Sequence, residues 1–174
     1  MSNAAYTCSY SSPLGKITLA SDGATLIGLW FDGQKYFGAT LPPTHAEKNL
    51  PVFDQTARWL DIYFRGQEPD FTPPLTLSGT PFRRTVAEIL LTVPYGKTIT
   101  YGEIAARIAR QQGAKAMSAQ AVGGAVGHNP ISIIVPCHRV VAGDGSLTGY
   151  AGGIQRKRRL LELEQTRALQ CRTR

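Results

Sequence analysis

A cysteine and a histidine are neighbours in the segment "IIVPCHRVVAGDG", which spans residues 133–145. Cys137 is followed directly by His138 and Arg139, and cationic neighbours lower the pKa of a thiol and raise its nucleophilic thiolate fraction. Glycine-rich stretches flank the segment on both sides, which suits a ligand that lies close to the backbone. A lone cysteine is more often an inert buried residue, but this setting favours a nucleophile.

A cysteine hydrolase is one interpretation of this pair. Such a mechanism needs a base that reaches the sulfur and a third group that orients the base. Adjacent residues of an extended strand point to opposite faces. Direct contact between Cys137 and His138 therefore requires the chain to turn at Pro136, or a water between the two groups. No oxyanion hole can be located from the sequence, so the hydrolase is the weaker interpretation.

Five short motifs occur in order along the second half of the chain: "TYGEIA", "AVGGAVGHNP", "PCHRV", "GYAGG" and "LLELE". This set resembles the methylated-DNA–protein-cysteine methyltransferases, also called O6-alkylguanine-DNA alkyltransferases. The resemblance spans essentially the whole chain and is strongest from residue 98 to residue 164. The alkyltransferase-like proteins, which lack the acceptor cysteine, are excluded because Cys137 is present.

The resemblance implies DNA repair by direct reversal. The Cys137 thiolate would attack the alkyl carbon on O6 of guanine in one SN2 step. The product is a stable thioether, so the reaction is an irreversible, single-turnover transfer that consumes the protein. Activity on O4-alkylthymine is left open. Because an alkyl group on O6 is not accessible to in-line attack within a duplex, the damaged nucleotide must be flipped out.

The resemblance also assigns catalytic roles. Cys137 resembles the acceptor, His138 the water-linked base, and Glu164 the carboxylate that orients this base. Asn129 resembles the residue that holds the turn below the acceptor, and Tyr101 the residue that donates a proton toward the leaving guanine. Taken singly, Asn129 could be only a turn former and Glu164 a solvated surface acid. Their occurrence together and in order favours the functional roles.

Further residues are expected to contact the base or the DNA. Tyr150 resembles part of the pocket that reads the flipped base. At Gln120 many family members carry an arginine that occupies the vacated base site, and glutamine lacks the charge and the stacking ability of arginine. The pair of glycines in "AVGGAVG" is costly in a helix, so something must approach it closely. The full set of expected contacts is Tyr150, Ala151, Val140, Gln120, Ser118, Arg139, Gly123 and Gly124.

The elements that must position these residues fall into two predicted domains. Residues 1–80 are expected to form an α/β domain, a β-hairpin or sheet plus a helix, which the resemblance identifies as ribonuclease-H-like. Strand-forming runs split by a "DG" turn cover residues 5–31, and an amphipathic helix follows and ends at Gly66. A proline-rich linker covers about residues 67–81.

Residues 81–174 are expected to form a mainly helical domain with a helix-turn-helix. A helix begins at Pro81, and a second follows a capping box at Thr100–Glu103 and ends at Gly113. Ser118 can cap a third helix, which completes the helix-turn-helix. Residues 131–135 read as a short buried strand. The last helix is expected to turn its leucines inward and the arginines of "RKRR" outward.

The charge of the chain restricts the classes of partner that it can bind. The chain of 174 residues carries a net charge of +7, and its Lys and Arg residues cluster after residue 80, which favours a polyanion. With the helix-turn-helix, this predicts double-stranded DNA carrying O6-alkylguanine as the partner of a monomer. A non-catalytic helix-turn-helix regulator is the alternative.

Three widely spaced cysteines indicate free thiols in a reducing compartment, and they complete no metal-ligand spacing. We therefore expect no metal and no cofactor. No apolar run of about 18 residues and no secretory signal are present, which predicts a cytoplasmic protein, nucleoid-associated when bound to DNA, without membrane contact.

Overall fold

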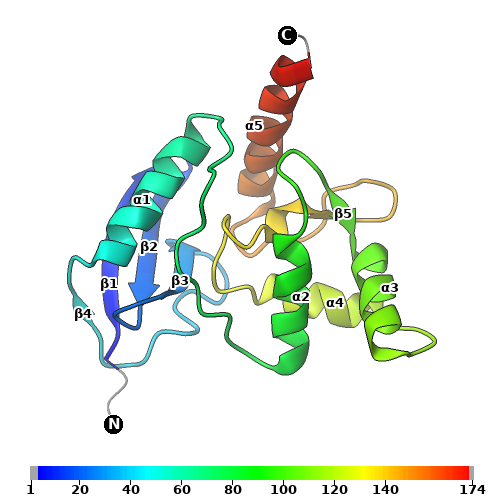
Figure 1. Cartoon of the computed structure of the whole chain (residues 1–174), viewed down its shortest axis with the longest axis horizontal. Helices are drawn as coiled ribbons and strands as arrows, with labels where there is room; N and C mark the ends of the chain where they lie inside the picture. Colours follow the sequence, from blue (N-terminus) through cyan, green and yellow to red (C-terminus); the bar gives the residue numbers. More distant parts are fainter. Residues whose placement is uncertain (1–3, 173–174) are drawn as a thin grey trace.

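The computed structural model describes residues 4–172, with side chains as far as residue 166, so both predicted domains extend by a few residues beyond the described part. Figure 1 shows a sheet flanked by one helix, followed by a mainly helical half. Within the described residues, no helix combines the length and the apolar character needed to cross a membrane. The elements are β1 (Tyr6–Ser12), β2 (Gly15–Ser21), β3 (Leu26–Phe31), β4 (Ala46–Glu47), α1 (Pro51–Phe64), α2 (Pro81–Leu91), β5 (Ile99–Thr100), α3 (Tyr101–Gln112), α4 (Ala119–Gly127), the 3-10 helix η1 (Cys137–Arg139), β6 (Val140–Val141) and α5 (Ile154–Arg172).

The N-terminal half is a four-stranded sheet in the order β3-β2-β1-β4, with α1 packed beside it (Figure 1). β1, β2 and β3 are antiparallel neighbours, and β4 pairs in parallel with β1. Apolar side chains of β2 and β3 are buried together with the inner face of α1, including Trp59, Leu60 and Tyr63. The predicted α/β domain, a hairpin followed by a helix, is confirmed.

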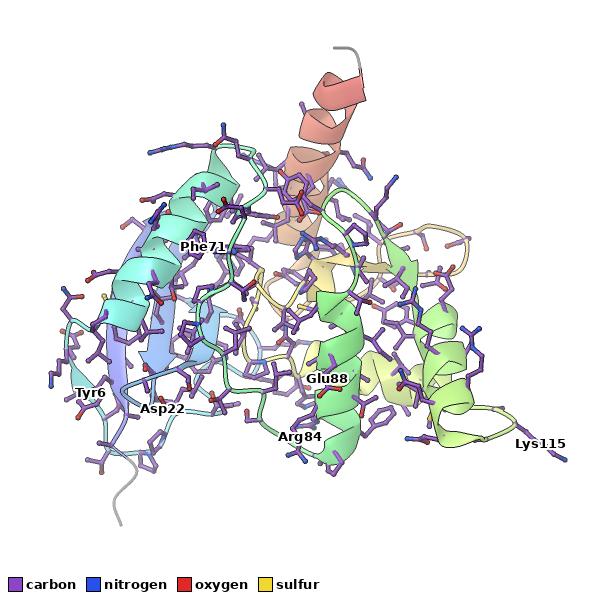
Figure 2. The ribbon with its side chains drawn as sticks, in the orientation of Figure 1. Tyr6, Asp22, Phe71, Arg84, Glu88 and Lys115 are labelled. Atoms are coloured by element: carbon purple, nitrogen blue, oxygen red, sulfur yellow. The ribbon has the colours of Figure 1, made fainter. Side chains whose placement is uncertain are left out.

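The predicted linker runs along the edge of β3. The Leu26 amide donates a hydrogen bond to the Pro74 carbonyl at 2.8 Å, and the Thr76 amide donates to the Leu26 carbonyl at 3.0 Å. Phe71, labelled in Figure 2, lies under the guanidinium of Arg58 from α1. Backbone pairing and this aromatic contact hold the linker against the first domain.

The helical half follows the capping signals of the sequence. The Thr100 side chain accepts from the Glu103 amide and the Glu103 carboxylate accepts from the Thr100 amide, which completes the capping box of α3. Gly113, with φ of 65°, ends α3, and the Ser118 hydroxyl caps α4. Lys115 lies in the connection between these helices and points away from the molecule (Figure 2). The predicted helix-turn-helix is confirmed as a pair of packed helices.

The strand predicted at residues 131–135 is wrong. Ile131 alone forms a bridge, with Leu29 of β3. The chain then turns back, because Ile133 adopts a left-handed φ of 68° and the Val135 amide donates to the Ile131 carbonyl at 3.1 Å. A run of β-branched residues predicts burial correctly, but here the buried segment is a turn that leads into η1.

The last helix, α5, joins the two halves and corrects a second expectation. Leu160 and Leu161 are buried as predicted. Arg156, however, does not point outward: its Nε donates to the Leu14 carbonyl at 2.9 Å, and its guanidinium covers the Phe31 ring at 4.6 Å from the centroid. The long side chain donates to a carbonyl of the first domain and packs against the sheet.

Candidate active site

Cys137 lies at the start of η1 and is only 4% exposed. The chain turns at Pro136, as a close Cys137–His138 pair would require. Burial raises the pKa of the Cys137 thiol, and a hydrogen bond from the Asn129 side chain and the positive charge of Lys157 act in the opposite direction. The thiol is therefore held protonated at rest, and its ionisation needs a base.

Asn129 shapes the turn that precedes Cys137. Its Nδ2 donates to the Val135 carbonyl at 2.8 Å and to the Ile131 carbonyl at 3.2 Å, while its Oδ1 accepts from the Ile131 amide at 3.0 Å. One side chain thus satisfies three backbone groups that no strand pairs. The geometry agrees with a residue that supports the turn below the thiol.

His138 and Glu164 form a fully buried pair. The distance from His138 Nε2 to Glu164 Oε1 is 2.7 Å, and both side chains are 0% exposed. Burial alone would raise the pKa of the Glu164 carboxyl, but hydrogen bonds and charge from His138 and Arg139 hold it at about 2. Glu164 is therefore an ionised acceptor rather than a solvated surface acid.

The Glu164 carboxylate determines the tautomer of the imidazole. Burial lowers the pKa of His138, so the ring is neutral. Because a carboxylate can only accept, His138 Nε2 must carry the ring proton. The lone pair is then on Nδ1, which is buried and has no hydrogen-bond partner among the described residues. This nitrogen is free to act as a base.

Arg139 was expected to contact DNA, and the structure corrects this. It is 8% exposed. Its Nη2 lies 2.9 Å from Glu164 Oε1, its Nε 3.0 Å from Glu164 Oε2, and its Nη1 donates to the Val93 carbonyl at 2.7 Å. A buried carboxylate requires a compensating charge, and Arg139 supplies it inside the protein.

Cys137 opens onto a pocket of about 210 Å³ between the two halves of the molecule. Several residues predicted to contact substrate line this pocket: Tyr101, Gly123, Gly124, Tyr150 and Ala151. Val140, in β6, is fully buried and is not among the residues that line the pocket. Ser118 and Gln120 lie at the exposed start of α4, outside the pocket. Apart from Val140, the residues predicted to read the base therefore line the pocket, and those predicted to contact the DNA duplex lie at the start of α4.

The first domain contributes one wall of the pocket, which the sequence motifs do not predict. Lys35 and Tyr36 line the pocket together with His128. The Tyr36 and His128 rings are stacked with centroids 3.9 Å apart, and the Lys35 amide donates to the Ala151 carbonyl at 3.1 Å. The sequence signal for this wall is the aromatic pair in the polar, glycine-containing segment "DGQKYFG". Neighbouring aromatic residues in such an exposed segment indicate a binding surface.

Lys157 was also missed, because it lies in the basic run that was assigned to the surface. It is 0% exposed. Its Nζ donates to the Thr148 carbonyl at 2.9 Å and the Gly149 carbonyl at 3.1 Å, and the Tyr101 hydroxyl donates to the same Thr148 carbonyl at 3.2 Å. Both side chains anchor the glycine-rich loop that carries Tyr150.

Gly152 is required by this loop. An added Cβ would lie 2.8 Å from the Tyr150 ring and 3.1 Å from Phe31, so only glycine lets Tyr150 lie this close to the backbone. Among the side chains that the structure describes, residues 4–166, no group of three His, Cys, Asp or Glu is placed to hold a metal ion.

Two family models together match most of the chain. The model described as "6-O-methylguanine DNA methyltransferase, ribonuclease-like domain" matches residues 5–77, and the one described as "6-O-methylguanine DNA methyltransferase, DNA binding domain" matches residues 81–166. The fold and the site therefore define the class of the protein: a DNA-binding methyltransferase whose cysteine opens onto a pocket.

Relatives and solved structures give the same result. The methylated-DNA–protein-cysteine methyltransferase of Mycobacterium bovis is 48% identical over 90% of each chain, and that of Haemophilus influenzae is 40% identical over 93% of this chain and 87% of its own. The crystal structure of Mycobacterium tuberculosis OGT in complex with DNA has 45% identity and a TM-score of 0.78, with 94% of each chain covered. The chain belongs to the methylated-DNA–protein-cysteine methyltransferase family, as the sequence predicts.

Proposed function

We propose that this protein repairs DNA by irreversible transfer of the alkyl group from O6-alkylguanine to Cys137. The observation that carries the proposal is the placement of the Cys137 thiol at a pocket, with a fully buried His138–Glu164 pair that begins at the next residue of the chain. A neutral imidazole backed by a carboxylate is a suitable base for a thiol whose pKa is raised by burial.

The reaction proceeds in one displacement. A proton passes from Cys137 Sγ, through a water, to His138 Nδ1, and the imidazolium that forms is stabilised by Glu164. The thiolate then attacks the alkyl carbon, the S–C bond forms, and the C–O6 bond breaks with its electron pair going to the purine. Tyr101 exchanges its Thr148 partner for the base and donates a proton as the guanine leaves. The proton held on His138 then passes through solvent to the Tyr101 phenolate, so the net change moves the thiol proton to guanine and the alkyl group to sulfur.

The pocket receives a nucleotide that has been flipped from the duplex. Gly123 and Gly124 line the pocket, and an added Cβ at Gly124 would meet nothing within 4 Å beyond its chain neighbours and the backbone of its own helix. The absence of a side chain there is therefore not needed for helix packing, which supports close approach of the substrate. Gln120 and Ser118, exposed at the start of α4, contact the duplex, and Gln120 fills the space that the nucleotide leaves.

The surroundings of this reaction follow from its chemistry. The partner is double-stranded DNA carrying O6-alkylguanine. It is bound by the second domain, residues 81–174, and the boundary between the two domains lies near residue 80. All proposed catalytic groups come from one chain, which supports a monomer. The acceptor must remain a free thiol, which supports the cytoplasm and its reducing conditions. The reaction itself needs no cofactor, since the thiol is the only acceptor.

A mass measurement tests the proposal. Incubation with an O6-methylguanine duplex should add one methyl group, about 14 Da, to the peptide that holds Cys137. Cys137→Ser should bind the duplex and gain no mass. Methylation of Cys8 or Cys171, or more than one turnover per protein, would contradict the proposal. DNA binding without any mass change would instead support the non-catalytic regulator.

A further inference from the structure

Tyr63 connects the first domain to the buried His138–Glu164 pair. It comes from α1, 101 residues before Glu164, and its hydroxyl donates to Glu164 Oε1 at 2.8 Å. The same hydroxyl lies 3.4 Å from His138 Nε2. Tyr63 is 0% exposed, so this contact is made without competition from solvent.

The protons in this cluster permit one arrangement. His138 Nε2 carries a proton and has no lone pair to offer, so the Tyr63 hydroxyl cannot donate to it. The single hydroxyl proton therefore goes to Glu164 Oε1. That oxygen thus accepts from Tyr63, His138 and Arg139 together, while the Gly96 amide and Arg139 Nε reach the other oxygen.

The Tyr63 ring is fixed in place. Trp59 stacks on it at 5.3 Å with an interplanar angle of 9°, and Tyr95 meets it edge-on at 6.1 Å. Burial and the nearby Glu164 carboxylate raise the pKa of Tyr63 well above its ordinary value, so the group remains a proton donor at any physiological pH. A rigid ring with a permanent donor is suited to hold a carboxylate in one orientation.

We propose that Tyr63 is a positioning residue for alkyl transfer: its hydroxyl holds the Glu164 carboxylate ionised and turned toward His138, which keeps the imidazole neutral and able to accept a proton in mildly acidic solution. The inference rests on the function proposed above. It means that the first domain takes part in the chemistry through α1. The titratable and charged groups that face Tyr63 are Glu164, His138, Arg139, Tyr95 and Tyr150.

Removal of the hydroxyl should change how the pair binds protons. In Tyr63→Phe the ring remains, but Glu164 loses one donor and becomes more basic, so a proton is held more tightly on the coupled His138–Glu164 pair. The acid limb of the pH–rate profile should move up by about one pH unit, a tenfold change in proton affinity. Below that limb, transfer should slow about tenfold, while above it the rate should stay within about twofold.

Tyr10→Phe is a matched control. The Tyr10 hydroxyl also donates to a carboxylate of α1, Asp61 Oδ1, at 2.6 Å. The control therefore removes a tyrosine–carboxylate bond between α1 and a neighbouring element, but far from Cys137. Its pH–rate profile should match that of the wild-type protein. A purely structural effect of losing such a bond would appear in both variants.

The experiment measures second-order transfer from free O6-benzylguanine at a series of pH values, together with the 15N titration of the His138 ring. An upward shift of both curves in Tyr63→Phe alone supports the proposal. A uniform loss of rate at every pH, or unshifted curves, overturns it. Failure of the proposed function would appear separately, as no methyl transfer from an O6-methylguanine duplex, and the His138 titration would still decide the role of Tyr63.

Discussion

Cys137 is a thiol that its surroundings keep protonated until a base acts on it. Burial raises its pKa, and the Asn129 amide and the Lys157 ammonium only partly offset this. Such a thiol resists adventitious oxidation, because oxidants attack the thiolate. The cost falls on His138, which must accept a proton while fully buried. The Glu164 carboxylate makes this possible, and donors from Tyr63, His138, Arg139 and the Gly96 amide keep that carboxylate ionised.

The same pair predicts how stability depends on pH. Burial lowers the pKa of His138 below its usual 6.5, so below about that pH the unfolded chain binds a proton that the folded protein excludes, and stability falls. The Glu164 carboxyl has a pKa of about 2 instead of 4.5, so stability falls again between those values. Urea midpoints measured from neutral to acidic pH should decline in both windows.

Two variants on α5 test this dependence. Glu164→Gln should weaken the decline in the lower window, and it should destabilise the protein at neutral pH by about 3–5 kcal/mol because Arg139 loses its buried partner. Glu162→Gln, at an exposed position on the same helix, should leave the whole profile unchanged. A wild-type midpoint that stays constant through either window would contradict the assigned protonation states.

At the scale of elements, α4 decides how the damaged nucleotide leaves the duplex. Gln120 lies exposed in the first turn, two residues after the Ser118 cap. If its side chain fills the vacated site, it offsets part of the unstacking energy of a few kcal/mol. Gln120→Arg should speed repair of duplex DNA through stacking and charge, and Gln120→Ala should slow it. Second-order rates on an O6-methylguanine duplex measure both effects.

Free O6-benzylguanine is the control substrate, because it has no duplex to open. All three proteins should react with it at equal rates. Equal rates on the duplex would mean that Gln120 does not enter the helix. Parallel changes on the free base would mean that the residue shapes the pocket, against its observed place outside the pocket lining.

The elements also show how far local sequence determines this fold. Helix boundaries were predictable where caps define them, as at Thr100, Ser118 and Gly113, because these signals act within a few residues. The strand predicted at residues 131–135 was wrong because the conformation of this segment depends on hydrogen bonds from the Asn129 side chain and on the bridge with the distant strand β3. A local hydrophobic pattern does not encode these contacts.

The site divides in the same way. The motifs predicted the residues near Cys137, but the contributions of Tyr36, Tyr63 and Lys157 arise only when the first domain and α5 pack against η1 and the pocket. An aromatic residue on the buried face of a helix is ordinarily core. Only the partner of its hydroxyl reveals another role, and that partner is 101 residues away.

At the scale of the whole molecule, the positive charge has two uses. Arg139 and Lys157 are buried and hold the site together, and Arg156 joins the domains. Exposed cations of the second half remain available for phosphates. Among residues 81–166, they are Arg83, Arg84, Lys97, Arg107, Arg110, Lys115, Arg158 and Arg159. The net charge of the chain is therefore larger than the positive charge that is exposed for contact with DNA phosphates.

Base damage occurs in any sequence, so binding should depend on salt and not on the sequence of undamaged DNA. The logarithm of affinity should fall linearly with the logarithm of salt concentration, with a slope of about 0.9 per phosphate neutralised.

Lys115, just before the N-terminus of α4 (Figure 2), is well placed for a phosphate attracted to that helix end. Lys115→Gln should therefore reduce the slope by about one. Lys16→Gln, which removes an exposed cation paired with Asp32 in the first domain, should leave the slope unchanged. Fluorescence anisotropy with duplexes of different sequence measures these slopes. Affinity that is insensitive to salt, a marked sequence preference, or equal slopes for Lys115→Gln and the wild-type protein would contradict this account of DNA binding.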